Sequence, residues 1–105
     1  MGLTFSPQAV RQIDEIYKFI ARDSPAAARS VIDRIYEVST HVAANPNTGR
    51  ATVVPEVRMF VVNPYPYLLY FRKKRNEVRI LRVVHAARRR QFELKDEARP
   101  FSPAL

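Results

Sequence analysis

The strongest constraint on the fold is a change in the spacing of apolar residues, from a helical repeat in the first half of the chain to alternation in the second. Ser6-Pro7 and Ser24-Pro25 each precede apolar residues spaced three and four apart. Serine is a favoured N-cap and proline fits the first helical turn, so each pair marks a helix start. The spacing predicts helices over about residues 7–23 and 25–44, the second ended by Asn45-Pro46. Because only a residue or two separate them, we expect a helical hairpin.

Strand signals flank this hairpin. Apolar and aromatic residues favour a short first strand and a later group of three, predicted at Gly2–Phe5, Val57–Val62, Tyr67–Arg72 and Val78–Val84. An N-terminal strand, a helical hairpin and a three-stranded antiparallel meander make an α+β domain, with the hairpin on one face of a largely antiparallel sheet. The length fits a single domain over residues 1–105, with a loose tail from about residue 91.

Composition removes several function classes. The chain has no cysteine, two glycines and two histidines that lack metal-ligand spacing. Disulfides, a glycine-rich phosphate loop and a metal site are therefore not expected, and no cofactor is implied. No apolar run approaches the roughly 20 residues of a membrane span, and no secretory signal opens the chain. We predict a cytoplasmic protein that does not enter a membrane.

Positive charge is concentrated in the second half of the chain. The net charge is +8, and residues 51–105 hold twelve basic and five acidic side chains. Fourteen of the 18 cations are arginine, whose planar fork suits carboxylate or phosphate. The sequence thus predicts an acidic partner, either nucleic acid or protein, with a solvated basic surface as the alternative.

The last strand carries the candidate functional residues. Arg79 and Arg82 are three residues apart, so strict alternation places them on opposite faces. Arg82 either braces the fold by pairing with Glu56 or Glu37, or serves a function. His85 is a candidate acid–base group at the strand end, although such a histidine is more often structural. Three arginines, Arg88, Arg89 and Arg90, follow as candidate anion-binding or solvated cations.

Several segments together resemble a known family. FSPQAVRQIDEIYKFIARDSPAAARSVIDRIYEV, ANPNTGR and VRMFVVNPYPYLLYFRKKRNEVRILRVVHAARR resemble the RelE/ParE toxin superfamily of bacterial type II toxin–antitoxin modules over residues 3–90. ILRVVHAAR is most similar to the ParE branch. The resemblance implies the RelE/ParE-like fold and a cognate antitoxin, ParD-like or similar, in a hetero-oligomer. It also implies one of two activities: ParE-type toxins inhibit DNA gyrase, and RelE-type toxins cleave mRNA on the ribosome.

The RelE-type nuclease set is incomplete here. The resemblance places Arg58 and Arg82 at phosphate-binding positions and His85 near a catalytic histidine, but no tyrosine follows Tyr70. We therefore predict a target inhibitor rather than an enzyme, with DNA gyrase as target and mRNA endoribonuclease activity as the alternative. The target-binding candidates are Arg58, Arg82, His85, Arg88, Arg89 and Arg90. The antitoxin-binding candidates are Ile13, Tyr17, Ile20, Ile35, Tyr67 and Phe71.

Overall fold

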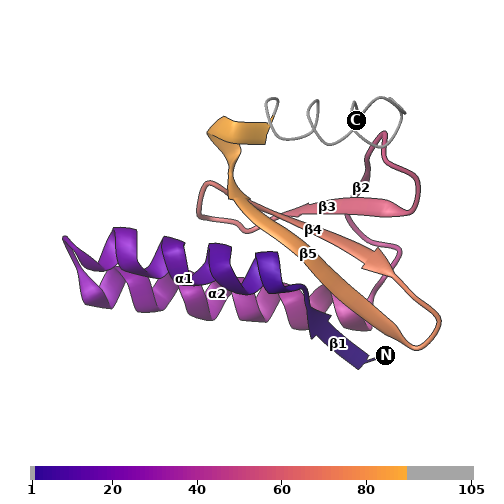
Figure 1. Cartoon of the computed structure of the whole chain (residues 1–105), viewed down its shortest axis with the longest axis horizontal. Coiled ribbons are helices and arrows are strands. Elements are labelled where there is room, and N and C mark those ends of the chain that lie inside the picture. The colour runs from indigo at the N-terminus through magenta and orange to yellow at the C-terminus, as the bar shows by residue number, and fades with distance from the viewer. Residues whose placement is uncertain (1, 90–105) are drawn as a thin grey trace.

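The computed structural model describes residues 2–89. Its elements follow the chain as β1 (Gly2–Phe5), α1 (Pro7–Ala21), α2 (Pro25–Ala44), β2 (Arg50–Ala51), β3 (Val57–Val61), β4 (Tyr67–Lys73), β5 (Glu77–His85) and the 3-10 helix η1 (Ala86–Arg88). The predicted α+β architecture is confirmed (Figure 1). The two-residue strand β2 and the three-residue helix η1 were not predicted, because segments so short carry no periodicity. The expected tail from residue 91 lies outside the described residues.

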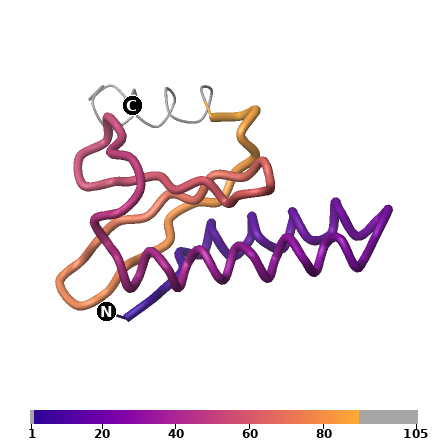
Figure 2. The backbone as a smooth tube through the Cα atoms, turned by 180° about the vertical axis from the view of Figure 1, so that it is seen from behind, coloured from indigo at the N-terminus to yellow at the C-terminus, as the bar shows by residue number. Residues whose placement is uncertain are grey.

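Both helices begin as the sequence indicates. Ser6 accepts a hydrogen bond from the amide of Ala9, and Ser24 accepts one from Ala27, each at 3.0 Å. The hairpin covers one face of the sheet, and its turn projects beyond the strands in both views (Figures 1 and 2). At about 1.5 Å per residue, the 20 residues of α2 are about 30 Å long, which explains the overhang.

The five strands form one sheet in the order β1-β5-β4-β3-β2. β1 lies parallel to β5, and the remaining neighbours are antiparallel. β4 is the middle strand of the five, and β5 is an interior strand between β4 and β1. The sequence pattern could not show this, because β1 and β5 are separated by most of the chain and pair only in the folded state.

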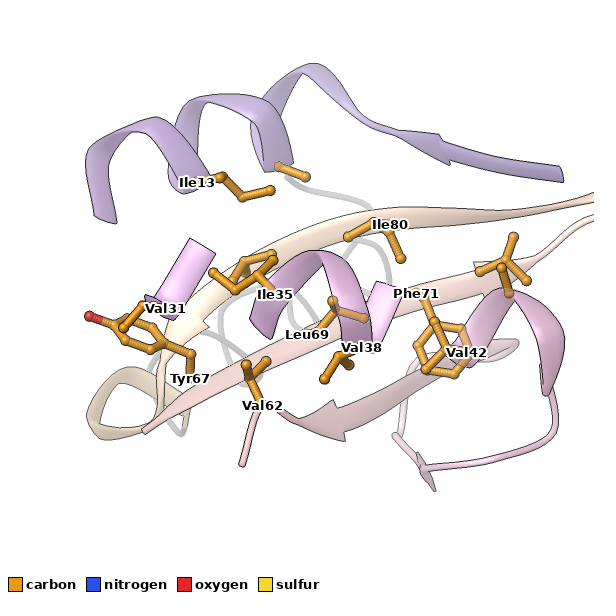
Figure 3. Packing of buried hydrophobic residues seen from close by; sticks show 14 residues of the cluster. Ile13, Val31, Ile35, Val38, Val42, Val62, Tyr67, Leu69, Phe71 and Ile80 are labelled. Carbon is orange, nitrogen blue, oxygen red and sulfur yellow. The ribbon is translucent and has the colours of Figure 1, made fainter. Parts of the chain in front are cut away.

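The main core fills the space between the hairpin and the sheet. Side chains from both layers meet there, as Figure 3 shows for Ile13, Ile35, Val38, Leu69, Phe71 and Ile80. The strand residues of this core define what we call the helix face, formed by Tyr67, Leu69, Phe71, Val78, Ile80 and Val83. A second buried cluster on the opposite side defines the distal face, formed by Val57, Met59, Leu68, Tyr70 and Val84. Each face of the sheet therefore carries a buried apolar cluster.

Helix α1 completes the hydrogen bonding of β5 where β1 ends. The β1–β5 register runs only to Phe5 opposite Ile80. Beyond it, the Ser6 hydroxyl donates to the Leu81 carbonyl at 2.8 Å, and the Gln12 side-chain oxygen accepts from the Val83 amide at 2.8 Å. Because β1 does not extend along this part of β5, these two side-chain contacts satisfy backbone groups of β5 that would otherwise be unpaired. The N-cap serine therefore also joins the first helix to the last strand.

Two features of the described residues bear on the function classes. Within residues 2–89, no helix is long and apolar enough to cross a membrane. In the same range, no three side chains of the His, Asp and Glu types come together as a metal site would require.

Candidate functional site

A bulge in β5 brings two arginines onto one face. Tyr70 lies opposite Arg82, but Phe71 lies opposite Ile80, so Leu81 is an extra residue in β5. Directly opposed residues point to the same side of a sheet, and an extra residue inverts the alternation beyond it. Arg82 thus shares the distal face with Tyr70. Arg79 lies opposite Arg72 and shares that face as well. The prediction that Arg79 and Arg82 lie on opposite faces is wrong because it assumed unbroken alternation.

The position of Arg82 on the distal face excludes one of the two acidic partners expected for it. Glu37 lies on α2, where its carboxylate accepts from the Arg34 guanidinium at 3.2 Å. Helix α2 packs on the helix face, so the sheet separates Glu37 from Arg82. The expected pairing of Arg82 with Glu37 is therefore wrong.

Arg58 faces the other way and supports a loop. It lies opposite Phe71, which places it on the helix face. Its Nε donates to the Thr48 carbonyl at 2.7 Å, and its terminal nitrogen donates to the Gly49 carbonyl at 3.0 Å. Gly49 has a φ of +81°, a conformation that favours glycine. Arg58 thus anchors the turn between α2 and β2, and two nitrogens of its guanidinium group donate to backbone oxygens.

His85 ends β5 with one ring nitrogen already occupied. Its Nδ1 accepts a hydrogen bond from the Ala87 amide at 3.0 Å, which caps η1. Its ring packs edge-on against Tyr67, with centroids 5.4 Å apart. Burial raises the pKa of the Tyr67 hydroxyl above its ordinary value. The histidine is exposed, and these contacts give it a structural role at the strand end.

The candidate nuclease residues do not converge. Arg58 and Arg82 lie on opposite faces of the sheet, and His85 lies at the end of β5. General acid–base catalysis requires its groups within hydrogen-bond reach of one substrate. The arrangement of these three residues does not provide that geometry.

A groove beside His85 combines apolar and basic side chains. It has a volume of about 590 Å³ and lies between the second half of α1 and the end of β5. Ile16, Phe19 and Tyr67 supply apolar surface, and the cations on its walls are Lys18, Arg22 and Arg88. The Phe19 side chain is 66% exposed, and the Arg22 guanidinium lies 6.0 Å from its ring centroid. Glu15 is the one acidic side chain among the described residues that line the groove, so its walls carry an excess of positive charge.

The arginines after β5 lie in different surroundings. Arg88 is exposed in η1. Arg89 is half-buried and lines a second hollow with Arg50, Met59 and Leu68. Arg90 lies outside the described residues.

Three of the six antitoxin-binding candidates, Ile13, Ile35 and Phe71, are buried in the main core and are not available as a docking surface. Tyr67 is buried in the same core but also lines the groove beside His85. Ile20 is half-buried against that core, and Tyr17 is exposed. Helical spacing identifies the apolar stripe of a helix but not whether its partner is the same chain or another. Besides Tyr17, five large apolar side chains that were not among the candidates are exposed within the described residues: Val10, Phe19, Tyr36, Val53 and Val61.

Comparison with known proteins places this chain in a family. The model of the ParE toxin of the type II toxin–antitoxin system parDE matches residues 3–90.

This chain belongs to the ParE toxin family.

Two similar proteins agree with ParE membership. The chain is 37% identical over 79 residues to the candidate toxin Y4kP of Sinorhizobium fredii (strain NBRC 101917 / NGR234), covering 75% of this chain and 81% of Y4kP. It is also similar to a chain of the chromosomal ParDE TA system from P. aeruginosa, with a TM-score of 0.72 and 30% identity. That match covers 81% of this chain and 95% of the other. The predicted RelE/ParE-like fold and the ParE branch are thereby confirmed.

Proposed function

We propose that this ParE-family toxin acts by binding and inhibiting DNA gyrase in the cytoplasm, and that a cognate antitoxin neutralises it. The observation that carries the choice of a binding mechanism is the separation of Arg58 and Arg82 onto opposite faces of the sheet. Family membership supports the toxin role. The net charge of +8 suits a target that itself handles DNA or carries acidic surface.

The antitoxin proposal rests on the surface of the helical hairpin. The similar P. aeruginosa protein comes from a ParDE TA system. The groove between α1 and β5 offers Phe19, Ile16 and three cations, which suits an acidic segment with apolar anchors. We propose that the antitoxin, ParD-like or similar, is encoded by the neighbouring gene and places such a segment in this groove. A toxin–antitoxin hetero-oligomer follows.

The test is inhibition of ATP-dependent supercoiling of relaxed plasmid by purified gyrase. We expect the full chain to block supercoiling, and His85→Gln to retain the effect, because a binding mechanism needs no acid–base group at this position. Arg88→Gln should weaken inhibition, whereas Arg11→Gln, which removes an equal charge from exposed α1, should not. No inhibition by wild-type chain in large molar excess would refute the gyrase proposal.

A second assay tests the ribonuclease alternative directly. Primer extension on an mRNA under translation would show new 5′ ends if the chain cleaved it on the ribosome. We expect no such ends. Cleavage that disappears in His85→Gln would replace the binding mechanism with the endoribonuclease.

The proposed antitoxin is tested by co-expressing the chain with the product of the neighbouring gene. We expect that product to co-purify with the chain and to restore supercoiling by gyrase. Phe19→Glu should prevent co-purification, because it removes an exposed apolar anchor and adds a charge that repels an acidic segment. Tyr36→Glu is the control on the other helix. Equal binding by wild type and the Phe19 variant would refute the groove as the docking site.

A further inference from the structure

Two arginines oppose each other across β4 and β5. Arg72 lies directly opposite Arg79 in the antiparallel register, and both side chains are half-buried on the distal face. Side chains at opposed positions have Cβ atoms about 5 Å apart, and like charges so placed destabilise a sheet. A local repulsion of this kind is relieved when an anion lies between the two guanidinium groups.

Arg79 is held in place by a short chain of hydrogen bonds. One of its terminal nitrogens donates to the Thr4 hydroxyl at 3.3 Å, and that hydroxyl donates to the Glu77 carboxylate at 2.9 Å. The Thr4 proton is committed to Glu77, so the hydroxyl oxygen accepts from Arg79. This arrangement occupies one of the five N–H groups of Arg79 and orients the others.

Arg72 carries a buried donor without an acceptor. Its Nε is inaccessible to solvent and has no hydrogen-bond partner within the part of the chain that the structure describes. Val57 lies opposite Arg72 on the β3 side, and Val57 is buried, so the guanidinium has an apolar wall on one side and Arg79 on the other. Buried polar groups are normally hydrogen-bonded, and an unpaired one is costly.

We propose that Arg72 and Arg79 form a second contact for the acidic antitoxin, a binding site for one of its aspartate or glutamate side chains that lies apart from the α1–β5 groove and nearer the other end of β5. This inference rests on the proposed antitoxin pairing. The Arg72 side chain is only half-buried, and a change of its rotamer on binding brings Nε to the surface. A planar carboxylate of the partner then accepts from Nε and a terminal nitrogen at once, which supplies the acceptor that Nε lacks in the free chain. The small planar group also fits beside the Val57 wall.

The surrounding charge supports an acidic peptide. Residues 72–79 carry five cations and a single acidic residue, Glu77. Three of those cations, Lys73, Lys74 and Arg75, are exposed at the hairpin tip. They attract acidic segments at long range, and the opposed pair then provides the specific contact. The half-buried pair suits a carboxylate beside apolar residues, whereas a nucleic-acid backbone would contact the exposed tip.

The test measures binding by the full chain to two labelled probes at fixed salt: a 12-residue peptide of alternating glutamate and leucine, and a 12-nucleotide single strand. Arg72→Gln and Arg79→Gln should each weaken peptide binding about tenfold or more, the range of a lost charged hydrogen bond. The matched control Arg75→Gln removes an exposed charge from the same hairpin and should weaken it less than threefold.

Three outcomes would overturn the site: no peptide binding by wild type, equal losses in all three variants, or a loss confined to the nucleic-acid probe. Thermal unfolding of the free chain separates a binding role of Arg72 from a structural one. Arg72→Gln should raise the melting temperature of the free chain by a few degrees, because the opposed charges are removed. A lower melting temperature for Arg72→Gln would show instead that Arg72 stabilises the fold.

The neighbouring gene product separates failure of this site from failure of the proposed function. If that product binds wild type, Arg72→Gln and Arg79→Gln equally, the carboxylate site is wrong and the antitoxin pairing stands. If it binds none of them, the antitoxin pairing is wrong, and the peptide measurement still decides whether the arginine pair takes a carboxylate.

Discussion

Two serines that are equivalent in the sequence should differ in their contribution to stability. Ser6 and Ser24 both precede proline and both cap a helix, each accepting one backbone hydrogen bond at 3.0 Å. Only Ser6 also donates to the Leu81 carbonyl, at 2.8 Å, beside the bulge in β5. We therefore predict that Ser6→Ala destabilises the protein more than Ser24→Ala does.

The expected difference follows from the two kinds of contact. Losing an N-cap serine costs about 1 kcal/mol, which applies to both variants. Ser6→Ala also removes a hydrogen bond across the fold and leaves the part-buried Leu81 carbonyl without that donor, which adds about 1 kcal/mol. Ser6→Ala should therefore cost about 2 kcal/mol and Ser24→Ala about 1 kcal/mol. For a chain of this size, the melting temperatures should differ by about 4–8 °C.

The assay is urea unfolding followed by circular dichroism at 222 nm, since the chain has no tryptophan to report by fluorescence. The denaturant slopes should match, so that midpoints compare stability directly. Ser6→Thr, which retains the hydroxyl, is the control and should recover most of the loss. Equal midpoints for the two alanine variants would refute the reasoning, because the link to β5 would then contribute nothing.

Three further predictions concern the loop after α2 and the buried tyrosine. Gly49→Ala should cost about 1–3 kcal/mol in urea unfolding, because a Cβ there would lie 2.6 Å from a β3 carbonyl at a φ of +81°; an unchanged midpoint would contradict this. Arg58→Gln should lower stability by about 1–2 kcal/mol through loss of its two carbonyl contacts, whereas exposed Arg50→Gln should stay within about 0.5 kcal/mol; equal effects would remove the bracing role. Because the pKa of Tyr67 is raised in the folded state, its stabilising contribution is present below about pH 10 and is lost as pH rises through the folded-state pKa. Tyr67→Phe should therefore flatten the alkaline decline in melting temperature, whereas Tyr17→Phe, at an exposed position, should not.

The helices and the strand meander were predictable because local physics specifies them. The Ser-Pro starts, the Asn45-Pro46 stop and the change of period each act within a few residues. Element bounds from those signals agree closely with the observed α1, α2, β3, β4 and β5. The sequence could not show β2, because a two-residue strand exists only through its pairing with β3.

The candidate site was less predictable because its geometry depends on register. Sequence alternation separated Arg79 from Arg82, yet the extra residue Leu81 places both on the distal face. Arg58 was grouped with Arg82 by position in the family pattern, although the pairing with Phe71 turns it toward the helices. Of the proposed antitoxin contacts, Ile13 and Ile35 met the chain's own sheet instead of a partner.

The helical hairpin, the strands, the concentration of arginine in the second half and the similarity to the ParE branch can all be read from the amino-acid sequence. These properties depend on composition and on contacts between near neighbours in the chain. Three other properties are set by long-range packing: which face each arginine occupies, which apolar residues remain exposed, and which backbone groups Ser6 and Gln12 satisfy. Those outcomes depend on β1 and α1 meeting β5, more than 70 residues away in the chain, where a single bulge inverts the faces of all the residues beyond it.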